Sequence, residues 1–212
     1  KEPWQLDRLA FTHFALAEAG AGSLGGVGGL YQVQDRLNPW AQALLALAID
    51  RLSPGDPRAG TLLANLEAGA LRSATGAHWE ETVPDRQNWG NTIFSSAVVV
   101  YALAHKNPAS PLLADAVRFL VAHRDAEGWW ASSYTSAWVV MALTKTMQGT
   151  GELGGNFAFS AAVNGTELAA GQAGGSTPLN PVRAALPLSG LYPAAPNALA
   201  LTHGAGEGRL YY

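Results

Sequence analysis

Two kinds of helical pattern alternate along the first 150 residues. Residues 4–19 carry apolar groups at the spacing of one helix face: Leu6, Leu9, Ala10, His13, Phe14 and Ala17. The stretch "IFSSAVVVYALA" in residues 91–105 is instead apolar nearly all round. Because a helix without a polar side has to be covered on every side, the alternation predicts inner helices shielded by an outer layer of amphipathic ones.

Six helices are predicted in this part of the chain. Asn38-Pro39 and Ser110-Pro111 are start signals, since proline is favoured at the first helical position. The glycine run Gly22–Gly29 is predicted to be a loop. The expected helices are residues 4–19, 39–52, the stretch after the loop 53–57 to about 72, 91–105, a helix that starts at Ser110-Pro111 and reaches Val121, and 132 or 133 to about 147.

The helices repeat in pairs. Leu62-Leu63-Ala64 lies seventeen residues before Trp79, and Leu112-Leu113-Ala114 lies seventeen residues before Trp129, an offset of fifty. Each unit joins an amphipathic helix to one that is apolar all round. The pattern predicts an α/α toroid segment over residues 1–149, a half-barrel of about three helix pairs.

Four tryptophans lie at the predicted junctions between consecutive helices. Trp79, Trp89, Trp129 and Trp130 all occupy such positions, and "GWWASSYTSAWVVMAL" begins at Gly128. We interpret the four indoles as packing groups that fill the gap between the layers. The alternative is a ligand cavity lined by aromatic side chains.

The hydrophobic period changes after Thr150, where "GTGELGG" reads as a flexible joint. Alternation over 157–163, then Asn164-Gly165 and Glu167-Leu168, predicts a hairpin with a type I′ turn. Asn164 also opens an Asn-Gly-Thr glycosylation sequon, although the turn is a sufficient explanation. Further strands are expected at 182–188, with Pro187 making it an edge, at Leu199–Leu201, and at 209–212. Residues 155–212 therefore predict an incomplete antiparallel β-sandwich, and we expect the chain to be a segment of a longer protein.

Composition excludes several classes of function. The net charge is −3 with 14% charged residues and no basic run, so nucleic-acid binding has no electrostatic basis. Cysteine is absent, which excludes disulfides, thiolate metal sites and cysteine nucleophiles within this chain. No apolar run reaches the roughly 18 residues of a membrane span.

The histidines give no clear metal site. His13 lies on an apolar helix face, where a core histidine is expected. "HWEE" places His78 beside Glu80 and Glu81, but no third ligand is evident.

Acidic residues flank the Gly128 turn, where Asp125 and Glu127 are interpreted as solvated loop residues. The alternative is that they act as general acids in a toroid enzyme of the terpenoid-cyclase or glycan-processing type. Too few acids point to one place, so we assign no catalytic, cofactor-binding or metal-ligating residue, no cofactor, and no enzyme activity.

Four stretches together resemble the bacterial alpha-macroglobulin family. "GWWASSYTSAWVVMAL" looks like the last inner helix of the family's thioester-type toroid, and "FAFSAAVNGTEL" is similar to the hairpin that opens the next β domain. "LYPAAPNALAL" and "GAGEGRLYY" resemble later segments of that domain. The match spans about residues 128–212, and the helix pairs extend it upstream.

The resemblance implies a non-catalytic part of a broad-range endopeptidase inhibitor, a protease trap of the periplasmic or extracellular cell envelope. Family members rearrange when a bait segment is cleaved, and some link to the protease through a Cys-x-Glu-Gln thioester. Since this chain has no cysteine, that motif would lie upstream. The implied partners are other domains of the parent chain and, through it, target proteases. An isolated half-ring would expose apolar inner helices and could dimerise.

Overall fold

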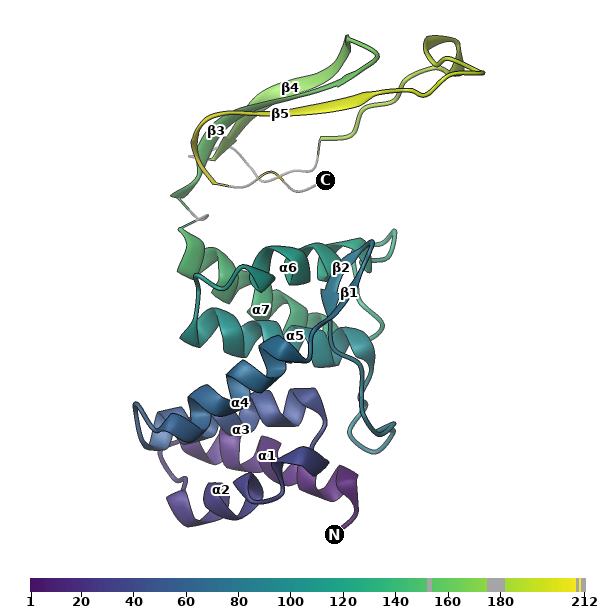
Figure 1. Cartoon of the computed structure of the whole chain (residues 1–212). Coiled ribbons are helices and arrows are strands. Elements are labelled where there is room, and N and C mark those ends of the chain that lie inside the picture. Colours follow the sequence, from purple (N-terminus) through teal and green to yellow (C-terminus); the bar gives the residue numbers. More distant parts are fainter. Residues whose placement is uncertain (152–153, 175–181, 209, 211–212) are drawn as a thin grey trace. The chain divides into compact units, whose positions relative to one another are not determined.

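The computed structural model describes residues 1–151, 154–174, 182–208 and 210. The described part of the chain is mainly helical, with small antiparallel sheets (Figure 1). It divides into two compact units, Lys1–Gly149 and Thr150–Tyr212, which are treated separately below.

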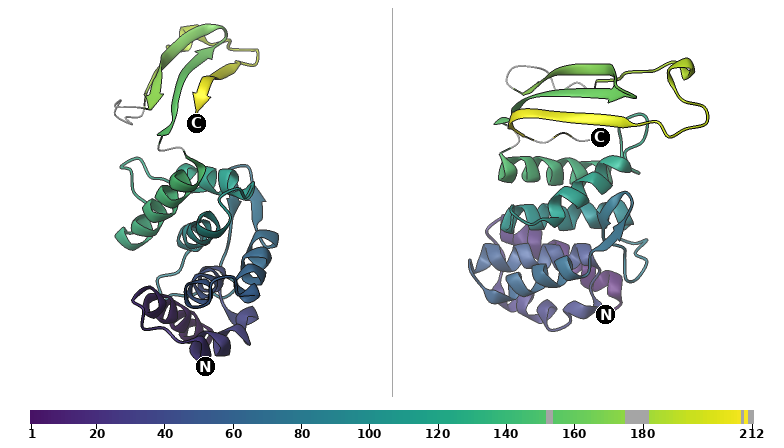
Figure 2. Two further views of the ribbon diagram at one scale, coloured as in Figure 1. Left: turned by 90° about the vertical axis from the view of Figure 1, so that its left-hand side faces the viewer. Right: turned by 45° about the horizontal axis from the view of Figure 1, so that its top comes forward.

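The first unit arranges its helices in two rows (Figure 2). Helices α3 and α5 form the centre of the inner row, with α1 beside α3 and α7 beside α5. Helices α2, α4 and α6 form the outer row. The bounds are α1 (Pro3–Glu18), α2 (Leu24–Tyr31), α3 (Pro39–Leu52), α4 (Pro57–Ala68), α5 (Thr92–Lys106), α6 (Leu112–Ala122) and α7 (Ser133–Thr150).

Helices α3 and α5 are buried on every side, as predicted for residues 91–105, whereas α7, expected to be the last inner helix, is buried on one face only. Every residue from Ala43 to Ile49 in α3 and from Phe94 to Val100 in α5 is buried. Seven consecutive buried residues cover all faces of a helix, which has 3.6 residues per turn. Neighbours must therefore surround both helices.

Trp138 of α7 lies close to aromatic rings of two other helices in the inner row, α1 and α5. Its ring centroid lies 6.2 Å from that of Phe94 and 5.9 Å from that of Tyr101, both on α5. Phe14 of α1 is also within reach, at 6.4 Å. The row is therefore curved strongly enough for its first and last helices to approach the same indole.

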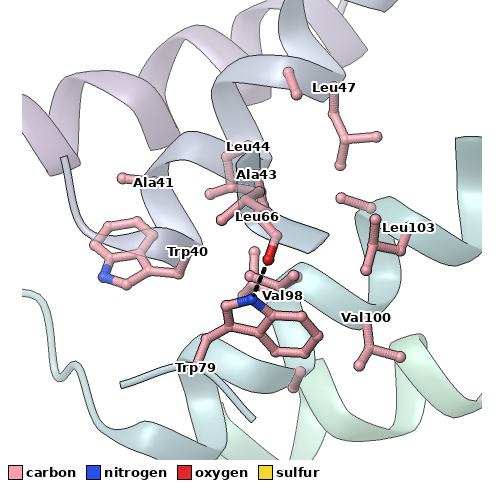
Figure 3. Close-up of a cluster of buried hydrophobic side chains, with 14 of the residues drawn as sticks. Trp40, Ala41, Ala43, Leu44, Leu47, Leu66, Trp79, Val98, Val100 and Leu103 are labelled. Carbon is pink, nitrogen blue, oxygen red and sulfur yellow. Dashed lines mark hydrogen bonds between the residues drawn. The ribbon is translucent and has the colours of Figure 1, made fainter. Parts of the chain in front are cut away.

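Two tryptophans bridge the rows in the same way. The indole nitrogen of Trp79 donates to the Leu66 carbonyl of α4 at 2.7 Å, and its backbone amide donates to Ser96 Oγ of α5 at 3.0 Å. Trp130 repeats both contacts, with the α6 carbonyl of Leu120 at 2.6 Å and Ser136 Oγ of α7 at 3.1 Å. Each buried indole fixes the end of an outer helix to the start of the next inner one, and Figure 3 shows the first bridge within the core.

The packing prediction is wrong for the other two tryptophans. Trp89 is 74% exposed and Trp129 is 62% exposed. Asp125 accepts the backbone amide of Trp129 at 2.8 Å. In the turn held by this hydrogen bond, the Trp129 indole is exposed to solvent and the Trp130 indole is buried in the core. The structural repeat therefore pairs Trp79 with Trp130, one residue away from the sequence offset of fifty.

The glycine run predicted as a loop is mostly helix α2. Ser23 caps it by accepting the Gly26 amide at 3.4 Å, and Val27 and Leu30 are buried. A side chain at Gly26 would overlap the ring of His13, so glycine lets α2 lie close to α1. Tertiary packing outweighs the poor helix propensity of glycine here.

The third expected helix ends earlier than predicted, at Ala68. A short hairpin follows, made of β1 (Leu71–Ser73) and β2 (Gly76–His78). The hairpin lies against α6, where Gly76 has a φ of +129° and a Cβ would overlap the backbone carbonyl of Asp115. Only glycine fits both the conformation and the space.

The second unit contains one three-stranded antiparallel sheet in the order β4-β3-β5, from β3 (Asn156–Val163), β4 (Thr166–Gly174) and β5 (Leu199–Glu207). The predicted turn is confirmed, since Asn164 and Gly165 have φ values of 51° and 81°. The Asn164 side chain donates to Asn197 Oδ1 at 2.7 Å and accepts the Ala198 amide at 3.0 Å. The amide of the sequon therefore holds the turn to the segment before β5.

Two of the expected strands, at 182–188 and 209–212, are not confirmed by the structure. The strand at 182–188 is wrong, because residues 182–187 have no regular structure and Leu188–Gly190 form a 3₁₀ turn. The expected strand at 209–212 falls largely outside the described residues. The described residues form a single sheet in this unit, so the sandwich and the toroid are taken up below as proposals.

Removing the indole donor of the bridge should destabilise the first unit. We expect Trp79→Phe to cost about 2–3 kcal/mol of unfolding free energy, since it leaves the Leu66 carbonyl unpaired and opens a gap. All seven tryptophans lie in this unit, so urea unfolding followed by tryptophan fluorescence reports on it alone. Trp129→Phe is the control, expected to stay within about 0.5 kcal/mol. Equal losses in both variants would contradict the bridge.

Gly76 gives a second test of the packing. We expect Gly76→Ala to destabilise the first unit by more than about 1 kcal/mol, through collision with the Asp115 carbonyl and an unfavourable φ. The control is Gly60→Ala in α4, where a Cβ would meet nothing within 4 Å. That change should stabilise by about 0.5–1 kcal/mol, because alanine is the better helix former. Thermal unfolding of both variants measures the two changes. A Gly76→Ala variant as stable as the Gly60→Ala variant would contradict the prediction.

Candidate functional site

An aromatic pocket of about 740 Å³ opens in the first unit, where the start of α3 and the start of α7 meet the loop before α5. Four of its walls are rings, those of Phe11, Trp40, Trp89 and Tyr134. Its polar lining comes from Arg8, Gln87, Asn88, Ser132 and Ser133.

Trp40 is the buried member of this aromatic group. It is 1% exposed and its ring centroid lies 5.3 Å from that of Phe94. Its indole nitrogen has no hydrogen-bond partner, in contrast to those of Trp79 and Trp130. Figure 3 shows this nitrogen on the side of the ring that faces away from Leu44 and Leu66. An unpaired buried N–H costs free energy, so the nitrogen is a candidate donor to a ligand.

Trp89 is the exposed member. Its φ of 61° lies in the left-handed region, which a bulky residue rarely adopts. Gly90 follows it, and the Gly90 amide donates to the Asp85 carbonyl at 2.9 Å. This closed loop holds the indole at the pocket rather than in the core.

The loop that carries Trp89 is fixed to the helices by Asn38 and Asp7. Asn38 donates from its backbone and its side chain to the two Asp7 carboxylate oxygens, each at 2.9 Å. Its side-chain amide also accepts from the Val83 amide at 3.0 Å and donates to the Val83 carbonyl at 2.9 Å. Asn38 precedes α3 as the sequence predicted, but its side chain joins α1 to the loop and makes no cap hydrogen bond.

Asp85 and Asn88 form the other half of this polar cluster. Asp85 is 2% exposed and accepts the backbone and side-chain amides of Asn88 at 3.0 and 2.6 Å. Asn88 in turn donates to the Trp4 carbonyl at 2.8 Å and accepts from Arg8 Nε at 2.9 Å. Every side of the Asn88 amide is therefore used to hold the loop against α1.

Burial raises the pKa of Asp7 from 3.8 to about 7, against the opposing effect of the Asn38 hydrogen bonds. The carboxylates of Asp85 and Glu81 add to the increase. Burial also raises the pKa of Glu81, whose Oε1 is buried without a partner. The cluster is thus short of positive charge, and near neutral pH Asp7 is poised between its two protonation states.

The residues considered from sequence do not assemble into one site. His78 Nε2 lies 3.5 Å from Glu80 and its ring stacks on Phe119, while Glu81 joins the loop cluster. Asp125 accepts the amides of Glu127 and Trp129 and so shapes the turn. His13 packs against α2 next to Gly26. Among the described residues, no group of three His, Asp or Glu side chains could hold a metal ion.

Sequence reasoning missed the groups that shape this pocket. Asp7, Asn38 and Asn88 are widely separated in the chain, and nothing in their local patterns links them. One available signal was an aspartate at residue 7, next to the apolar stripe of the first helix, where a charge is costly to bury.

No protein-family model and no curated protein matches this sequence. Of the helices in the described ranges, none has the length and apolar character needed to cross a membrane.

The acidic cluster makes stability depend on pH. A pKa raised on folding means that the folded chain holds the Asp7 proton more tightly, so stability is full below pH 4 and is lost as pH rises through 7. Ionisation of Asp7 should lower the free energy of unfolding by about 2 kcal/mol between pH 5.5 and 8.5. Urea unfolding across this range should show the loss.

Asp7→Asn is the matched variant, because its amide does not titrate. Its pH slope should be smaller than that of the natural chain, whatever its absolute stability. An unchanged slope would show that other groups, such as His105, govern the dependence.

Proposed function

We propose that this chain is a non-catalytic scaffold segment of a bacterial alpha-macroglobulin-like protease trap, the end of its α/α toroid and the start of the following β domain. The proposal rests on the four sequence stretches that resemble the family. The curved double row of helices followed by an antiparallel sheet is consistent with it.

The single observation that carries the structural side of the proposal is the exposed apolar face of α7. Tyr134, Val140 and Met141 are 38, 55 and 42% exposed, whereas Trp138 and Val139 are buried. At the other end of the row, Phe11 and Leu16 of α1 are also exposed. Exposed apolar faces on α1 and α7 are suited to contact with further helices or domains of a parent protein.

A second candidate is a toroid enzyme, and the aromatic pocket favours it. That hypothesis expects the tryptophans to line the pocket together with at least two converging acids. Of Trp79, Trp89, Trp129 and Trp130, only Trp89 belongs to the described lining, and no carboxylate does. The scaffold proposal therefore has the better support.

Trapping by the full-length parent protein tests the proposal. The parent should protect casein from trypsin while leaving the hydrolysis of a small chromogenic peptide intact, because a trapped protease remains accessible to small substrates. The trap assignment would be overturned if trypsin still hydrolysed both casein and the small peptide, or if it hydrolysed neither.

Two substitutions connect that activity to α7. Val140→Asp with Met141→Asp should reduce casein protection at least tenfold, since charges on the apolar face would prevent the ring from closing. Ala64→Asp with Asn65→Asp places the same charges on exposed positions of α4 and should leave protection unchanged.

A further inference from the structure

We propose that the aromatic pocket binds a ligand made of an aromatic ring with a hydrogen-bond acceptor close to it. This inference concerns ligand binding by the described chain itself, at a pocket that shares Phe11 and Tyr134 with the exposed apolar faces of α1 and α7. It stands on the pocket's walls, on the unpaired nitrogen of Trp40 and on the conformation of Trp89.

The walls select for a flat ring. Rings from α1, α3, α7 and the loop before α5 surround one space, and its volume of about 740 Å³ falls within the usual range of small-molecule sites. Aromatic pairs prefer offset-stacked or edge-to-face contact, and such pairs gain more free energy than their buried area alone provides. A ring entering this space can meet Trp89 and Tyr134 in such geometries.

The polar groups select for an acceptor. The described lining offers donors in the Arg8 guanidinium, the Ser133 hydroxyl and the Gln87 amide, and it contains no carboxylate. Trp40 Nε1 can only donate, and it has no partner. A ligand oxygen would satisfy it, once the side chains that close over this nitrogen move aside.

Trp89 is placed for contact with a ligand rather than for folding. Its indole is 74% exposed, and its backbone holds a conformation that is unfavourable for a bulky residue. Trp129 is similarly exposed but has no part in the described lining. The two therefore form a matched pair for mutagenesis.

Titration of the ¹⁵N-labelled chain with three small probes tests the inference. The seven indole N–H signals can be assigned from variants in which one tryptophan at a time is replaced. Phenylacetamide should shift the signals of Trp40 and Trp89 in a saturable way, with the Trp40 proton moving downfield. Cyclohexylacetamide lacks the aromatic ring and ethylbenzene lacks the acceptor, so each should bind at least threefold more weakly. N-acetylphenylalanine amide, as a fourth probe, distinguishes a peptide source of the ligand from a free compound by binding more tightly.

Three variants complete the test. Trp89→Ala should weaken phenylacetamide binding at least fivefold, and Trp129→Ala should leave it unchanged. Trp40→Phe keeps a ring but removes the donor, so it should erase the preference for phenylacetamide over ethylbenzene. The absence of saturable shifts at Trp40 and Trp89, equal binding of the saturated probe, or equal effects of the two alanine variants would each overturn the inference. Because Trp89 is exposed, its alanine variant remains informative even if Trp40→Phe fails to fold.

Discussion

The absence of a polar side on α3 and α5 is the constraint from which the first unit follows. A helix that buries Ala43–Ile49 or Phe94–Val100 without a break has no face to offer to water. It needs a neighbour in its own row and a cover from a second row, so a single layer of helices is excluded. The helices at the ends of the inner row, α1 and α7, are less completely covered, and each keeps exposed apolar residues.

The tryptophan bridges determine how the two rows are joined. A buried indole adds apolar contact area, and its N–H satisfies a carbonyl near the end of an outer helix, where intrahelical partners run out. The backbone amide of the same residue binds a serine of the next inner helix. Serine is small enough for close helix packing and still offers an acceptor. One residue type thus links three elements, which explains why the repeat is visible in the sequence as a tryptophan.

How far the sequence predicts this fold depends on the range of the interactions involved. Periodicity and start signals predicted six helices and the Asn164-Gly165 hairpin, because those features are local. Helix α2 was missed since its stability comes from Val27, Leu30 and the close approach at Gly26, all tertiary effects. The choice between Trp129 and Trp130 depends on one turn held by Asp125. The Asp7–Asn38 pair and the aromatic pocket join segments far apart in sequence, and no local pattern encodes such a meeting.

The polar cluster and the aromatic pocket share a structural element, the loop before α5. Asn88 lines the pocket and is also the residue through which Asp85 and Arg8 hold that loop. Glu81 lies so close to Gly90 that a side chain there would overlap its carboxylate, so the segment after Trp89 is packed against an acid. Ionisation of Asp7 adds negative charge near Asp85 and Glu81, while the Asn38 hydrogen bonds favour the ionised carboxylate. The same loop therefore belongs both to the polar cluster and to the wall of the proposed ligand site.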